Sequence, residues 1–331
     1  MPRRRAVVIR GIRNVEFAAT LGHSHCECNI APAIFSTGKG GAVATGINGY
    51  WRVAHGRGLA LGDKGRLMAI VNVTPDSFSD GGRHFSVDKA VAHALSCVAD
   101  GADILDVGGE STRPGAEPVS ASEEQDRVLP VIERLARESD ALISIDTYRA
   151  ETARLAVAAG AHIINDVYGL QKEPEIANVS ASAGAGLCIM HTGRGRDRLD
   201  DVIKDQFDYL GKSLEIAATA GIDRETIVLD PGFGFAKETV EENMALMART
   251  QELFGLGYPL LVGTSRKRFL GTLTGREAAD RDAATAAATV LLRMKGASVF
   301  RVHNVAINRD ALAIADAMIA AQEESGEEPG R

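Results

Sequence analysis

Carboxylate, amide and basic side chains recur along this chain, each directly after a short apolar run. The acceptors among them are Asp146, Asn165 and Asp230, and the donors are Lys267, Arg301 and His303. Carboxylates bind N–H groups and basic side chains bind anions, so this mixture suits a ligand with both a polar ring and an anionic group. The residue types therefore favour a small-molecule site.

Arg113 lies in the Gly-rich loop 108–115, where the neighbouring Pro114 stiffens the backbone. If this loop faces Arg301 and His303, the three side chains form a clamp for phosphate or diphosphate, because basic side chains donate charge-assisted hydrogen bonds to phosphate oxygens. Two plainer interpretations stay open. Arg113 is then a solvated loop charge, and His303 a hydrogen-bonded core histidine.

Asp230 is the candidate for recognising a heterocycle. A carboxylate accepts two parallel hydrogen bonds from an amidine-like edge, as it does from arginine. Pro231 and the glycines that follow restrict the loop that begins at Asp230. The alternative is that Asp230 caps the next helix.

No cluster of His, Cys or paired carboxylates accompanies these residues in the sequence. Mg²⁺ is the cofactor that fits, since it commonly takes few protein ligands and binds substrate phosphates. His23-Ser-His-Cys-Glu-Cys28 packs four soft ligands into six residues. Zinc sites usually space their ligands by at least two residues and take a second pair from elsewhere, so this segment is a weak candidate.

Eight short apolar runs precede the polar residues, and helical patterns such as Val87–Ala99 and Glu151–Ala159 lie between them. The runs are Leu67–Val73, Ile104–Gly108, Leu142–Ile145, His162–Asn165, Leu187–Met190, Ile227–Leu229, Pro259–Gly263 and Val299–Val302. Strands that are apolar throughout belong to parallel sheets covered on both faces. Eight strand–helix repeats in roughly 250 residues predict an α/β fold, a (β/α)8 TIM barrel. A doubly wound open sheet is the alternative.

In such a barrel, the carboxyl ends of the strands form the mouth of the active site. Every predicted strand ends in hydrogen-bonding groups, which are Asn72, Asp106 with Glu110, Asp146, Asn165 with Asp166, His191, Asp230, Ser265 to Lys267, and Arg301 with His303. One or two would be ordinary helix caps. A full ring favours an enzyme over a structural barrel.

The whole chain sets wider limits. It has 331 residues, a net charge of −7, 45% hydrophobic and 24% charged residues. The negative charge gives no general attraction for nucleic acid or acidic membranes. No apolar run approaches the ~20 residues of a transmembrane helix, so no membrane association is expected. The four cysteines do not form a disulfide framework, which favours a reducing cytoplasm.

The two ends of the chain fall outside the barrel pattern. Residues 1–49 are Arg-rich and then Gly-rich, and we interpret them as an extension that is disordered or arises from a mis-assigned start codon. An organellar transit peptide is the third interpretation. The barrel domain is expected over residues 50–322, and residues 323–331 read as a flexible tail.

Several segments of the chain together resemble the dihydropteroate synthases, a family of pterin-binding TIM barrels. They are Ile70–Ser79, Asp106–Gly115, Ser144–Thr147, Ile164–Val167, Met190-His191, Leu229–Gly232 with Gly234–Lys237, Gly263–Lys267 and Arg301–His303. Their order is preserved over roughly residues 50–322, and the first two are long. The resemblance is therefore specific.

The resemblance implies roles for individual residues. The pterin would be bound by Asp146, Asn165, Met190, Asp230, Lys267 and Arg301. The diphosphate would lie among Asn72, Arg113, Arg301 and His303, with Asn72 helping to hold Mg²⁺. The p-aminobenzoate would be enclosed by Phe78, Thr112, Pro114, Phe235, Lys267 and the residue at position 268. The groups expected to carry the chemistry are Asp230, Lys267, Arg113, Arg301 and His303.

The implied reaction joins 6-hydroxymethyl-7,8-dihydropterin diphosphate to p-aminobenzoate in folate biosynthesis. Diphosphate leaves first, in an SN1-like step, and the aryl amine then attacks the pterin-methyl cation. Stabilising that charge separation is an electrostatic task that needs no covalent nucleophile. Members of this family are expected to be homodimers.

Two residues depart from the family pattern, and two rival functions stay open. Arg268 stands where members often have a serine, which puts a hydroxyl contact to the aminobenzoate carboxylate in doubt. Asn304 stands where an aspartate often follows Arg-Val-His. The rivals are a methyltetrahydrofolate-dependent methyltransferase and a non-catalytic, pterin-binding paralogue. Neither would need both Gly-rich loops, and here both are complete.

Overall fold

The computed structural model describes residues 49–73, 83–111 and 117–325. Eight parallel strands form one sheet in the order β8-β7-β6-β5-β4-β3-β10-β9. They are β3 (Arg66–Asn72), β4 (Ile104–Gly108), β5 (Leu142–Asp146), β6 (Ile163–Asp166), β7 (Gly186–Met190), β8 (Ile227–Asp230), β9 (Leu261–Val262) and β10 (Val299–Val302). A parallel bridge between Leu229 and Leu260 joins the two ends of the sheet. The predicted TIM barrel is confirmed.

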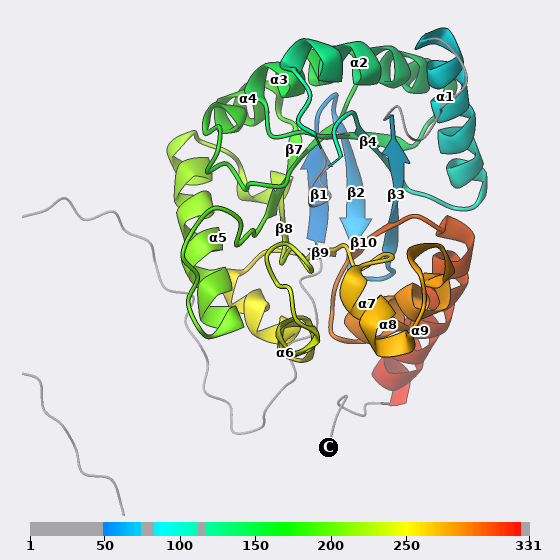
Figure 1. Ribbon diagram of the computed structural model, residues 1–331, viewed down its shortest axis with the longest axis vertical. Helices are drawn as coiled ribbons and strands as arrows, with labels where there is room; N and C mark the ends of the chain where they lie inside the picture. Colours follow the sequence, from blue (N-terminus) through cyan, green and yellow to red (C-terminus); the bar gives the residue numbers. More distant parts are fainter. Residues whose placement is uncertain (1–48, 74–82, 112–116, 326–331) are drawn as a thin grey trace, which may run out of the picture. The chain divides into compact units, whose positions relative to one another are not determined.

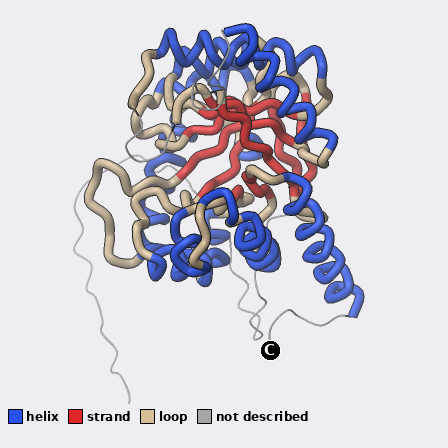
Figure 2. The backbone as a smooth tube through the Cα atoms, turned by 45° about the vertical axis from the view of Figure 1, so that its right-hand side comes forward, coloured by secondary structure: helices blue, strands red, loops and turns tan. Residues whose placement is uncertain are grey.

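Helices surround the strands on the outside (Figures 1 and 2). They are α1 (Arg83–Ala99), α2 (Ala121–Glu138), α3 (Ala150–Ala158), α4 (Glu175–Ala183), α5 (Val202–Thr219), α6 (Val240–Ala248), α7 (Arg268–Thr274), α8 (Asp282–Met294) and α9 (Val305–Ser325). Buried helix faces and buried strands form one large apolar core between the two layers. No helix in the described ranges is both long and apolar enough to cross a membrane.

The predicted strands agree with the observed ones except at β9, which is shorter than Pro259–Gly263. Pro259 has no N–H to donate, although its carbonyl accepts the Leu229 N–H at 3.0 Å. Leu260 makes only the isolated bridge. Proline therefore shortens the strand at the point where the barrel closes.

A β-hairpin of β1 (Gly49–Val53) and β2 (Arg57–Leu61) precedes the barrel, and it was not among the predicted strands. Three residues connect the strands, and His55 and Gly56 among them have positive φ, 59° and 67°, so that the Arg57 N–H can donate to the Ala54 carbonyl at 3.3 Å. Trp51 is buried, and its Nε1 donates to the Thr226 carbonyl at 2.8 Å.

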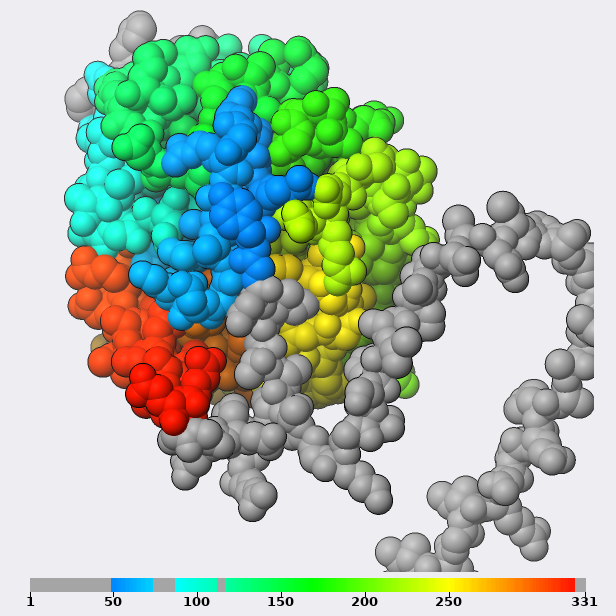
Figure 3. Space-filling model, turned by 180° about the vertical axis from the view of Figure 1, so that it is seen from behind, coloured from blue at the N-terminus to red at the C-terminus, as the bar shows by residue number. Residues whose placement is uncertain are grey.

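The hairpin covers the amino ends of the strands, as the view from behind shows (Figure 3). Trp51, Val53 and Leu61 pack against one layer of inward-facing residues, which are Met68, Ile104, Leu142, Ile163, Cys188, Val228, Leu261 and Val299. This end of the barrel is therefore apolar and closed. The polar residues of the strands lie at the other end of the barrel, where the strands have their carboxyl ends.

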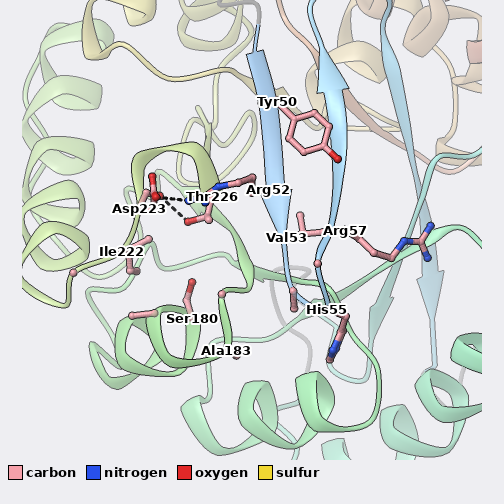
Figure 4. Close-up of a pocket in the computed structure, with 15 residues that line it drawn as sticks. Tyr50, Arg52, Val53, His55, Arg57, Ser180, Ala183, Ile222, Asp223 and Thr226 are labelled. Atoms are coloured by element: carbon pink, nitrogen blue, oxygen red, sulfur yellow. Dashed lines mark hydrogen bonds and ion pairs between the residues drawn. The ribbon is translucent and has the colours of Figure 1, made fainter.

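A hollow of about 440 Å³ lies beside the hairpin, between it, the end of α4 and the segment before β8 (Figure 4). Arg52 on β1 pairs there with Asp223 and, at 3.1 Å, with Glu225. All three side chains are about half exposed or more, so the pairs add little to stability.

Candidate active site

Arg301 on β10 lies between two carboxylates that come from much earlier in the sequence. Its Nε is 2.6 Å from Asp106 Oδ2 on β4, and its Nη2 is 2.7 Å from Asp146 Oδ2 on β5. The strand register explains this, since β3 pairs with both β10 and β4, and β4 pairs with β5. Three inward-facing side chains near the carboxyl ends thus meet inside the barrel.

Burial sets the charge balance of this cluster. It raises the pKa of Asp146 to about 7, against the lowering effect of Arg301. Burial opposes the charge on Arg301 too, but Asp106 and Asp146 hold its pKa above the usual range. Arg301 is therefore a permanent cation, whereas burial makes Asp146 easier to protonate than an exposed aspartate.

Asp106 carries an oxygen that is not hydrogen-bonded. Its Oδ2 accepts from Arg301 and, at 3.2 Å, from Asn165 Nδ2 on β6. Its Oδ1 is buried and has no partner within the described ranges. Leaving such an oxygen unpaired costs about 1–3 kcal/mol, so the cluster is not optimised for stability alone.

Asp230 ends β8 and shares the barrel interior with Lys267. Its Oδ1 accepts the Gly232 N–H at 2.7 Å, an intraloop bond rather than a helix cap. A Cβ added at Gly263 would lie 3.9 Å from both Asp230 Oδ2 and the Cβ of Arg301, so the three residues lie close together. Burial raises the pKa of Asp230 to about 6 and lowers that of Lys267 to about 8.

An apolar wall stands beside these charges. Val167, Met190 and Phe235 form a small buried cluster, separate from the main core. Lys267 Nζ lies 4.1 Å from the centre of the Phe235 ring, and the Arg194 guanidinium lies 4.5 Å from it. A flat, polar-edged ring could lie against such a wall with its edge toward the carboxylates.

Ser265 and His303 are linked at the mouth. Ser265 Oγ accepts the His303 backbone N–H at 3.1 Å and lies 2.9 Å from His303 Nδ1. Ser265 is almost fully buried, whereas His303 is partly exposed. The imidazole is thus oriented by a neighbour and does not sit in the apolar core.

Residues 68–303 match the family model described as pterin binding enzyme. The chain belongs to this pterin-binding enzyme family. It is 47% identical over 247 residues to the dihydropteroate synthase of Bacillus subtilis, which covers 75% of this chain and 86% of that protein.

Solved structures of the family agree. The Xanthomonas albilineans dihydropteroate synthase with 4-aminobenzoic acid has a TM-score of 0.78 and 45% identity, covering 83% of this chain and 99% of that one. The same enzyme in complex with 7,8-dihydropteroate has a TM-score of 0.74 and 44% identity, over 81% and 98% of the two chains. The activity expected from the sequence, a pterinylmethyl transfer that makes dihydropteroate in folate biosynthesis, is confirmed.

The family residues that fall in the described ranges lie together at the carboxyl end of the barrel, inside it or at its mouth. They are Asn72, Asp146, Asn165, Met190, Asp230, Phe235, Lys267, Arg301 and His303. Phe78, Thr112, Arg113 and Pro114 lie outside the described residues, as does the segment 23–28. In the described part of the chain, no three His, Cys, Asp or Glu side chains converge on a metal site.

The two departures from the family pattern have local partners. Arg268 begins α7, and its Nη2 donates to the Glu238 carbonyl at 3.0 Å. Asn304 Nδ2 donates to Asp282 Oδ2 at 2.9 Å, and Asp282 also pairs with both guanidinium nitrogens facing it from Arg266. An amide at position 304 therefore suits this chain, since a carboxylate there would face Asp282.

Sequence reasoning left Asp106 out of the site, although it had placed this residue at a strand end. The signal was an aspartate inside an otherwise apolar run, where a charge needs a buried partner. It also left out Lys237, which is almost fully buried after the Asp230 loop. Lys237 ends the resembling segment Gly234–Lys237, and its place in that segment was the corresponding signal.

Proposed function

We propose that this site binds a dihydropterin-methyl diphosphate deep in the barrel and p-aminobenzoate above it. The observation that carries the proposal is the buried set of opposed charges, in which Arg301 contacts Asp106 and Asp146 while Asp230 and Lys267 face the same interior. Each buried charge costs free energy of folding. A buried set of opposed charges therefore indicates a site where a bound ligand pairs with them.

The carboxylates would accept hydrogen bonds from the N–H groups on the edge of the pterin ring. Asp230 keeps Oδ2 for a ligand because Oδ1 is used by Gly232. Asp146 and Asn165 add polar groups from β5 and β6, and Lys267 adds a donor. Met190 supports the apolar face of the ring. Two N–H groups on one ring edge can then donate to one carboxylate, the strong geometry known from arginine.

The reaction at this site would proceed by separation of charge. The bond between the methylene carbon and the diphosphate oxygen breaks, and its electron pair leaves with the diphosphate. The amine nitrogen of p-aminobenzoate then attacks the cationic carbon and loses a proton. Arg301, His303 and Arg113 would stabilise the leaving group, and the carboxylates Asp106 and Asp146 would stabilise the cation.

The second substrate is assigned to the outer part of the site. Phe235 and Lys267 would lie against the aminobenzoate, with Phe78, Thr112, Pro114 and Arg268 around it. A ring between Phe235 and the cations near it gains both apolar contact and attraction for its carboxylate.

Mg²⁺ is the proposed cofactor, with the Asn72 amide oxygen as its protein ligand. This donor set fits, because Asn72 is a hard oxygen donor at the end of β3 and substrate phosphates commonly complete a Mg²⁺ shell. When bound, the ion would neutralise part of the diphosphate charge.

We also propose a cytoplasmic homodimer. Cys97 and Cys188 are buried free thiols, as a reducing compartment allows. Ile307, Ile314 and Met318 are exposed on α9 at spacings of seven and four residues, which places them on one helical face. An apolar stripe of this kind is typical of a surface covered by another subunit.

The decisive assay mixes purified protein with the dihydropterin diphosphate, p-aminobenzoate and Mg²⁺, and follows dihydropteroate and diphosphate. Stoichiometric formation of both is expected, together with loss of product when aminobenzoate is omitted. Pterin binding without product would instead support the non-catalytic paralogue. Methyl transfer from methyltetrahydrofolate to an added methyl acceptor would support the methyltransferase.

A further inference from the structure

A buried row of polar side chains lies behind the Asp230 loop and makes none of the substrate contacts assigned above. Asp205 on α5 is 2.9 Å from His191 Nε2, and His191 Nδ1 is 3.0 Å from Lys237 Nζ. The three residues expose 3%, 1% and 2% of their surfaces. Such groups are expensive to bury, so the row needs an explanation.

The hydrogen bonds in this row run in one direction. A lysine ammonium only donates, so His191 Nδ1 accepts from Lys237. A neutral imidazole then carries its proton on Nε2 and donates it to Asp205. Burial lowers the pKa of His191 to about 4, in keeping with a neutral ring. Arg196 also donates to Asp205, from Nη2 at 2.7 Å and from Nη1 at 2.9 Å, and its Nη2 lies 2.9 Å from His191 Nε2 as well.

The other bond of Lys237 leads to the substrate site. Lys237 Nζ donates to the Gly232 carbonyl at 2.9 Å, while the Gly232 N–H donates to Asp230 Oδ1 at 2.7 Å. Both polar groups of this one residue are therefore held, one by the lysine and one by the carboxylate. Gly232 therefore links Lys237 to Asp230, with one hydrogen bond to each side chain.

The loop that these bonds hold is conformationally demanding. Gly232 has φ of 62°, and a Cβ there would lie 2.0 Å from the His191 carbonyl oxygen. Gly234 and Ala236 also have positive φ, 75° and 55°. Glycine adopts such conformations readily, whereas at the non-glycine Ala236 neighbouring contacts must hold it.

We propose that Lys237, oriented by His191 and Asp205, is a positioning residue that aims Asp230 at the pterin edge. It acts through Gly232 and does not touch the substrate. The proposal rests on the assigned role of Asp230. A purely structural lysine would contribute to folding but leave the ligand affinity of the folded protein unchanged.

Burial and the charges around Lys237 act on its pKa in opposite directions. Burial lowers its pKa to about 7, and the nearby carboxylates Asp230 and Asp205 oppose that shift. Lys267 and Arg198 add to the lowering. Burial thus disfavours the ammonium form of Lys237, whereas the two carboxylates favour it.

Lys237→Met in the full-length protein removes the ammonium group and both of its hydrogen bonds, with little change in side-chain length. We expect the affinity for a pterin lacking the diphosphate to fall by about 10- to 100-fold in calorimetric titration, as for loss of one or two charge-assisted bonds. Lys237→Arg, which keeps a cationic donor, should recover most of that affinity. Thermal unfolding of each variant is measured alongside.

Arg293→Met is the matched control. Arg293 is another buried cation, and its Nη2 donates to the Gly62 carbonyl at 2.7 Å, but it lies next to the hairpin and not near the Asp230 loop. This variant should lose stability and keep the pterin affinity of the parent protein. Should Lys237→Met fail to fold, Asp205→Asn replaces it, with a smaller expected loss of affinity.

The outcomes separate the two assignments. Unchanged pterin affinity in folded Lys237→Met, or in Asp205→Asn when that variant stands in, overturns the positioning role if Asp230→Asn still weakens binding. Unchanged affinity in Asp230→Asn as well overturns the assigned pterin site itself. Equal weakening in Arg293→Met would show that the loss reports stability alone and would also overturn the proposal.

Discussion

Asp230→Asn is the substitution that tests the pterin site most directly, because the two oxygens of Asp230 have separate tasks. Oδ1 accepts the Gly232 N–H at 2.7 Å, and the amide oxygen of asparagine can keep this bond. The amide NH2 then replaces Oδ2, the oxygen that the Gly232 N–H does not use. The loop geometry is preserved, while the group offered to the ligand changes from acceptor to donor.

The expected loss in binding follows from that exchange. A donor on the pterin edge would meet a donor on the protein, so one charge-assisted bond is lost and one donor is left unpaired. Together these cost about 2–5 kcal/mol, which is a loss in affinity of about 30-fold or more. The measurement is a calorimetric titration with a pterin that lacks the diphosphate.

Stability should move the other way. Burial raises the pKa of Asp230 from 3.8 to about 6, so its folded-state carboxylate is disfavoured and the free energy of unfolding falls as pH rises between these values. Asparagine has no charge to bury, and the variant should be as stable as the parent protein at pH 7, or more stable. Urea unfolding at pH 7 measures this difference.

The pH dependence of binding gives a second check. Protonation of Asp230 removes an acceptor, so the pterin affinity of the parent protein should fall as pH falls through about 6. The asparagine variant should lose the part of this dependence that Asp230 contributes and keep the part that comes from Asp146. Pterin affinity that Asp230→Asn leaves intact would refute the reasoning and reduce Asp230 to a support for the Gly232 turn.

Three further predictions concern other parts of the chain. Trp51→Ala should lower the free energy of unfolding by about 3–5 kcal/mol in urea titration, and a loss under 1 kcal/mol would mean that the hairpin is not part of the folded core. A chain that starts at Gly49 should fold and turn over normally, since residues 1–48 precede the hairpin, and an insoluble or inactive product would contradict this. Arg113→Ala should lower kcat by on the order of 100-fold without changing the affinity for a pterin lacking the diphosphate, whereas Arg301→Ala should lower both. A raised KM for aminobenzoate alone would move Arg113 to the second substrate.

The sequence by itself determined the barrel. Strands such as Ile104–Gly108 and Val299–Val302 were predicted with their observed bounds, because a strand covered on both faces is apolar at nearly every position. The polar residue at the end of each run then located the mouth. Both signals are local, so a single sequence carries them.

The hairpin was beyond the reach of the same reasoning. Its two strands have five residues each, and only Trp51, Val53 and Leu61 in them are buried. What buries them is the apolar layer at the amino ends of strands far along the chain. A short, half-exposed segment shows no periodicity that separates it from an irregular extension.

Only the tertiary structure decided how the charges pair. Arg301 and Asp106 are 195 residues apart, and they meet because β10 and β4 pair with the two edges of β3. The row from Asp205 through His191 to Lys237 likewise needs α5 and the β8 loop to be in place. Local patterns report which residues are buried, whereas the partner that makes a buried charge tolerable is set by the closed barrel.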